Sequence, residues 1–121
     1  VGAAPGGGER FTASRPHMTA VLEVLGEDAR FFFDGVASPA SVAAPAARTL
    51  GVRTAVRTHH LDLGDEDVGA RLRAVEVALV LDGQAVVVTP PQPELLLALA
   101  EWMRGLRARR IHVLRLSEIV L

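Results

Sequence analysis

Apolar residues recur every three or four positions in two stretches of the chain, and this spacing predicts two amphipathic helices. The first stretch covers residues 17–29 and breaks near Gly26. The second covers residues 94–107, follows a proline-rich link and carries the single tryptophan of the chain, Trp102. Weaker signals predict two short helices, at residues 38–51 and 68–73.

Runs of β-branched, aliphatic and aromatic residues predict strands between these helices. Three consecutive phenylalanines within residues 30–36 place aromatic side chains on both faces of a strand, which is typical of a strand buried on both sides. Val75–Leu81 and Gln84–Thr89 flank Asp82-Gly83, a pair that two-residue turns prefer, so we predict a β-hairpin there. Two further strands are predicted at residues 51–59 and 111–116.

This order of elements predicts an α+β fold. We expect a two-layer sandwich, in which a mixed sheet of four or five strands carries its helices mainly on one face. Residues 1–16 are rich in glycine at their start and are interpreted as a leader. Residues 17–121 then form a single domain, which is an ordinary size for one hydrophobic core.

Composition excludes several classes of protein. Thirteen basic residues oppose fourteen acidic ones, so the net charge of −1 excludes a protein that coats nucleic acid by overall charge. The absence of cysteine excludes disulfides and thiolate chemistry. No apolar run approaches the length of a membrane span and no secretory signal is evident, so we expect a cytoplasmic protein. All basic residues are arginine, which indicates a GC-rich coding sequence.

A cluster of arginines near the end of the second long helix is a candidate anion site. Guanidinium groups suit phosphate, so this cluster favours an anion or nucleic-acid ligand, although few aromatic residues lie nearby to stack on bases. Cations at the end of a helix also complement its dipole without any ligand, which is the alternative interpretation. The residues are Arg104, Arg107, Arg109 and Arg110.

The densest set of potential metal ligands follows the strand predicted at residues 51–59. His59, His60 and Asp62 carry the imidazole and carboxylate groups that zinc, manganese or iron prefer, which makes a metal-assisted or acid–base enzyme an alternative function. Adjacent histidines in a strand point to opposite faces, so the competing interpretation is a solvated acidic turn that caps a helix. No nucleotide-binding fingerprint or catalytic motif is present, so no cofactor and no catalytic residue is predicted.

Self-association is the leading hypothesis. The helix at residues 94–107 has more apolar residues than one buried face needs, which predicts an exposed patch at Leu97, Trp102 and Met103. The alternative interpretation is a wide buried stripe under a curved sheet. Residues 59–82 hold six acids and two arginines, a net −4, whereas residues 83–121 hold three acids and five arginines, a net +2. Such segments attract each other across an interface. The chain is therefore predicted to be a non-catalytic association module that forms a homodimer.

Overall fold

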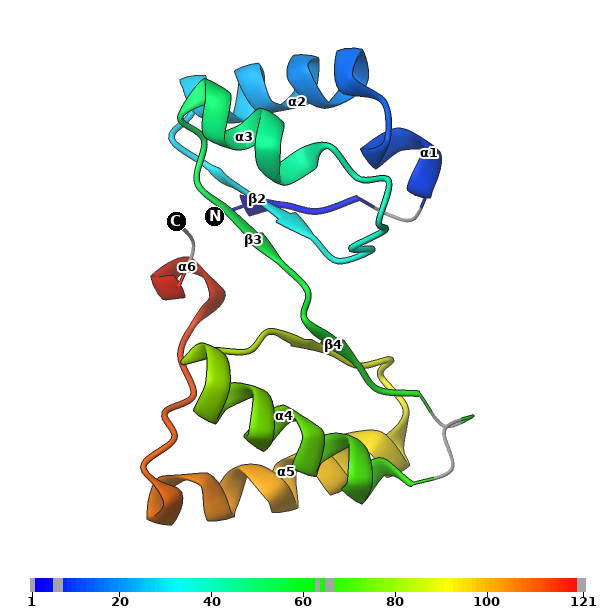
Figure 1. The fold of residues 1–121 in the computed structure, drawn as a ribbon, viewed down its shortest axis with the longest axis vertical. Helices are drawn as coiled ribbons and strands as arrows, with labels where there is room; N and C mark the ends of the chain where they lie inside the picture. The colour runs from blue at the N-terminus through cyan, green and yellow to red at the C-terminus, as the bar shows by residue number, and fades with distance from the viewer. Residues whose placement is uncertain (1, 6–7, 63, 65–66, 120–121) are drawn as a thin grey trace. The chain divides into compact units, whose positions relative to one another are not determined.

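A computed structural model describes residues 2–5, 8–62, 64 and 67–119 of the chain. The chain divides into two compact units. The first unit comprises Val1–Arg57 together with Arg115–Leu121, and the second comprises Thr58–Leu114. Each unit combines helices with short parallel strands, which confirms the α+β class (Figure 1).

The first unit contains a parallel sheet of three strands in the order β1 (Gly2–Ala3), β2 (Phe31–Asp34) and β3 (Thr54–Val56). Phe32 lies opposite Thr54, and Asp34 lies opposite Val56. Parallel neighbours require a crossover, which helices supply in both connections. The helices are α1 (Glu9–Thr12), α2 (Arg15–Glu27) and α3 (Ala43–Leu50), with α6 (Leu116–Ile119) near the end of the chain.

The consecutive phenylalanines of β2 belong to two separate clusters. Phe32 packs with α2 and α3 in a cluster that includes Met18, Leu22 and Ala47. Phe31 packs with Ala55, Phe33 and Leu116 in a second cluster. Both Phe31 and Phe32 are buried, so the prediction of a strand covered on both faces is confirmed.

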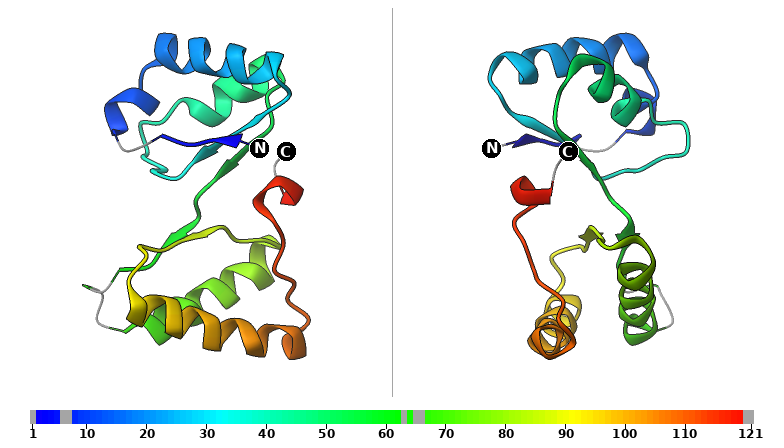
Figure 2. Two further views of the ribbon diagram at one scale, coloured as in Figure 1. Left: turned by 180° about the vertical axis from the view of Figure 1, so that it is seen from behind. Right: turned by 60° about the vertical axis from the view of Figure 1, so that its left-hand side comes forward.

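The second unit pairs β4 (His59–His60) with β5 (Val87–Val88) in parallel. Its helices are α4 (Val68–Asp82) and α5 (Pro93–Leu106), followed by the short 3₁₀ helix η1 (Arg107–Arg109). Figure 2 shows α4 and α5 packed side by side. Leu61, Leu72 and Leu95 form the buried core of this unit.

The predicted hairpin is wrong, because Val75–Leu81 lies within α4 and Gly83 ends that helix with a φ of 82°. Glycine tolerates the left-handed conformation at a helix end as readily as in a turn, so Asp82-Gly83 suits both structures. The predicted strand at residues 111–116 is also absent, since residues 111–115 have no regular structure. The described residues therefore form parallel sheets of three and two strands, and not one mixed sheet of four or five.

The helices predicted at residues 17–29 and 94–107 are both present, and their bounds shift by a few residues. The helix predicted at residues 17–29 is α2, and the one predicted at residues 94–107 is α5. Within residues 1–16, where the sequence indicates a leader, the structure has β1, α1 and the start of α2. In the described part of the chain, no helix has the length and apolar character needed to cross a membrane.

Candidate functional site

The carboxyl ends of the three parallel strands of the first unit lie at one edge of their sheet. The chain leaves β1 and β2 at this edge, and α1 lies beside it (Figure 1). Ligand sites of open parallel sheets lie outside the carboxyl ends of the strands. This carboxyl edge is therefore a candidate ligand site.

Asp34 is the last residue of β2, and its side chain is buried at this edge, with the residue only 2% exposed. Its Oδ1 accepts hydrogen bonds from the backbone N–H of Val36, at 3.2 Å, and of Ala37, at 2.9 Å. Its Oδ2 accepts a hydrogen bond from Ser41 Oγ at 2.6 Å. Both carboxylate oxygens are thus occupied by the loop that follows β2, so a buried polar group is fully compensated.

The same loop is tied to the rest of the edge by further hydrogen bonds. Ser41 Oγ accepts from Ala43 N, the first residue of α3, at 3.3 Å. Val42 N donates to the carbonyl oxygen of Thr12 at 2.8 Å, which joins the loop to the end of α1. Ala37 adopts a φ of 50°, a conformation that costs energy for a residue other than glycine. The Asp34 carboxylate therefore holds a strained loop in one conformation.

Arg57 brings a positive charge to this edge. It follows β3, and its backbone N–H donates to the carbonyl oxygen of Asp34 at 3.0 Å. Its Nη2 donates to the carbonyl oxygen of Val36 at 2.7 Å, so the half-buried guanidinium is fixed against the loop. The remaining guanidinium N–H groups make no hydrogen bond within the described part of the chain, and they are free to bind an oxygen of a ligand.

Sequence reasoning missed both residues of this site. Asp34 falls within the strand predicted at residues 30–36, and Arg57 within the strand predicted at residues 51–59, and no functional role was predicted for either. The available signal was a carboxylate directly after a doubly buried strand, where a parallel sheet places its functional residues. That signal requires knowing that the neighbouring strands are parallel.

The structure does not gather the predicted metal ligands, His59, His60 and Asp62, into one site among the described residues. His59 Nδ1 lies 2.9 Å from Thr58 Oγ1, which is itself bonded to the backbone of Val86. Asp62 Oδ1 accepts from Gly64 N at 3.1 Å and so forms a turn. Across the residues that the structure describes, no three His, Asp or Glu side chains form a group able to hold a metal ion.

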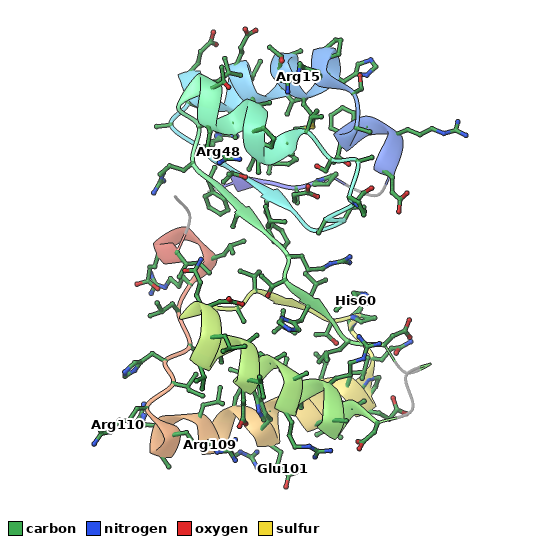
Figure 3. The ribbon with its side chains drawn as sticks, in the orientation of Figure 1. Arg15, Arg48, His60, Glu101, Arg109 and Arg110 are labelled. Carbon is green, nitrogen blue, oxygen red and sulfur yellow. The ribbon has the colours of Figure 1, made fainter. Side chains whose placement is uncertain are left out.

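The predicted anion site lies at the end of α5 and in η1, far from His60 along the second unit (Figure 3). Arg109 forms an ion pair with Glu76 of α4. Arg104, Arg107 and Arg110 are exposed, and Arg110 ends η1 with a φ of 58°. Arg109 is exposed as well, but it differs from the other three because its ion pair joins two helices.

The predicted interface residues differ in their surroundings. Leu97 and Met103 are exposed on α5. Trp102 is half-buried, packs against the core of the second unit and donates from Nε1 to Glu76 Oε1 at 2.8 Å. Its indole is therefore held in place by α4.

Comparison with known proteins identifies a family and a solved structure of similar fold. A sequence profile described as divergent polysaccharide deacetylase matches residues 1–120. An uncharacterized protein of Agrobacterium tumefaciens C58, ATU2773, has a similar fold, with a TM-score of 0.89 and 24% sequence identity. The similarity covers 98% of this chain and 49% of that chain, so this chain spans about half of its length. No curated protein matches significantly.

Proposed function

Because this chain belongs to the divergent polysaccharide deacetylase family, we propose that it takes part in removing acetyl groups from a polysaccharide. The observation that carries the proposal is the match itself, which extends over residues 1–120 and includes the whole carboxyl edge of the first sheet. In this reaction, water adds to the acetyl carbonyl carbon and acetate leaves. The bond to the sugar nitrogen or oxygen breaks, and that atom takes up a proton.

The carboxyl edge supplies groups that suit this reaction. Addition of water, with loss of one of its protons to the solution, places negative charge on the carbonyl oxygen, and fixed hydrogen-bond donors stabilise that charge. We assign this role to Arg57, because its guanidinium is anchored by Val36 and retains unused N–H groups. We assign Asp34 a positioning role, because the residue is only 2% exposed and both of its oxygens accept hydrogen bonds from the loop.

The proposal is tested by measuring acetate release from an acetylated polysaccharide by the purified protein. Replacing Arg57→Gln removes the charge and is expected to lower kcat/KM by about 10²-fold, the usual cost of losing one donor to a developing oxyanion. Arg53→Gln is the matched control, because Arg53 is exposed just before the same strand. Absence of acetate release would overturn the proposed activity. Acetate release that is unaffected by Arg57→Gln would overturn the role assigned to Arg57.

A second proposal, self-association, is supported by exposed apolar side chains on the second unit. Val77, Val80 and Leu81 of α4 and Leu97 of α5 are between 59% and 85% exposed. Val77, Val80 and Leu81 are three and four residues apart and so share one face of α4, and exposed apolar surface marks sites of protein association. We propose a second copy of this chain as the partner, because the acidic and basic segments of the second unit are complementary in charge. Light scattering at several concentrations tests this, and a strict monomer would exclude it.

A further inference from the structure

A hollow of about 570 Å³ lies between α4 and α5 on the second unit, well apart in the chain from Asp34 and Arg57. Its volume is within the range of small-ligand sites. Three of its lining residues are small, namely Gly69, Ala98 and Gly105. The others are aromatic, aliphatic or charged, namely Trp102, Leu72, Arg73, Glu76, Glu101 and Arg109.

The small residues leave room between the two helices. A side chain added at Gly105 would place its Cβ 3.4 Å from Arg109 Nη2, and one at Gly69 would place its Cβ 3.1 Å from Asp67 Oδ1. A side chain at Gly69 or Gly105 would therefore crowd a polar neighbour close by in the chain, Asp67 or Arg109. A larger residue at Ala98, which also lines the hollow, would fill the space.

The polar groups of the hollow are held in place before any ligand arrives. Glu76 Oε1 accepts from Trp102 Nε1 at 2.8 Å and is paired with Arg109 Nη1. The indole ring, the carboxylate and the guanidinium thus hold each other across the two helices. Pre-ordered side chains lose little entropy on binding, which favours affinity.

The charge of the hollow indicates the kind of ligand. Arg73 and Arg109 balance Glu76 and Glu101, so the lining has no net charge and does not favour an ion. A neutral sugar fits this lining, because its C–H face packs on an aromatic ring while its neighbouring hydroxyls bond to carboxylates and guanidinium groups.

We propose that this hollow binds one sugar unit of a neutral polysaccharide, a unit other than the one whose acetyl group reacts. The choice of a polysaccharide as ligand rests on the proposed function. Binding energy gained far from the reacting bond improves catalysis on long substrates. The hollow would therefore favour long polymers over short oligosaccharides.

Trp102 reports on this site directly, because it is the single tryptophan of the chain and lines the hollow. The protein is titrated with chitohexaose and with xylohexaose while its tryptophan emission is recorded. We expect a saturable change in emission with at least one of the two. No change with either oligosaccharide would overturn the proposal.

Two variants and a control locate the binding. Ala98→Leu fills the hollow and is expected to weaken binding at least tenfold, whereas Ala100→Leu, on an exposed position of the same helix, should leave binding unchanged. Glu101→Ala changes an exposed residue, so folding is retained, and the loss of a hydroxyl acceptor should weaken binding severalfold. Equal affinity in Ala98→Leu and Ala100→Leu would show that the sugar binds elsewhere and would overturn the proposal.

The readout separates this inference from the proposed deacetylation. A tryptophan response without acetate release would support the hollow and contradict the proposed activity. Acetate release without a tryptophan response would support the proposed activity and contradict sugar binding in the hollow. With both present, Ala98→Leu should raise KM for a long acetylated polymer and leave the rate on a short acetylated oligosaccharide unchanged.

Discussion

The Asp34 carboxylate accepts three hydrogen bonds from the loop after β2, and the shortest of them comes from Ser41. Ser41→Ala leaves Asp34 Oδ2 buried without that donor, so we expect the free energy of unfolding to fall by about 1–3 kcal/mol. Urea denaturation measures the change. Ser38→Ala is the matched control, because the Ser38 Oγ bond to Ala40 N is exposed and the expected loss is below about 0.5 kcal/mol. Equal losses in the two variants would contradict the role given to Asp34.

The importance of Asp34 cannot be deduced from its neighbours in the sequence. An aspartate before glycine is typical of an exposed turn. The hydroxyl that compensates its burial belongs to Ser41, seven positions later, in a segment where the pattern predicts a helix start at Ser38. The structure begins α3 at Ala43 instead, because the loop between them wraps around the carboxylate. Local patterns do not record such a contact.

At the scale of elements, the two ends of α4 carry aspartates with opposite expected effects. Asp67 Oδ1 accepts from Gly69 N at 2.9 Å and caps the start of the helix, so Asp67→Ala should lower the free energy of unfolding by about 1 kcal/mol. Asp82 lies at the other end, where a negative charge opposes the helix dipole. Asp82→Ala should therefore be neutral or slightly stabilising. Thermal denaturation followed by circular dichroism compares them, and destabilisation by Asp82→Ala would contradict this account.

The helices differ in how far the sequence could predict them. In α5 the apolar residues form a stripe, and Leu95 and Leu106 of that stripe are buried, so periodicity alone identified the helix. In α4 apolar residues lie on every side, and Val75 is buried while Val80 is exposed. Such a run has no helical period, and its β-branched composition favours a strand. The short helix predicted at residues 68–73 has the correct beginning, where Asp67 caps α4, but it ends nine residues too early.

At the scale of the whole molecule, the strand pairing lay beyond prediction. Strands β2 and β3 are joined by α3, and β4 and β5 by α4, so every described pair depends on a helical crossover. Predicting Val75–Leu81 as a strand removed one of these crossovers and produced an antiparallel pair in its place. The carboxyl edge with Asp34 and Arg57 belongs to the other sheet, and the sequence did not predict it because no pattern established that β1, β2 and β3 run in the same direction.

The apolar surface of α4 leads to a prediction about assembly. Val80 is 85% exposed, so Val80→Glu removes no core contact, but it places a charge in the proposed interface between copies. We expect the dissociation constant of the dimer to rise at least about tenfold, which corresponds to about 1.4 kcal/mol. Val24→Glu is the matched control, since Val24 is exposed on α2 of the first unit. Sedimentation should show Val80→Glu approaching the monomer mass of 12.8 kDa at concentrations where the unaltered protein and Val24→Glu remain dimers. Pairing would remove the exposed apolar side chains of α4 from water. Equal behaviour of Val80→Glu and Val24→Glu would contradict an interface on α4.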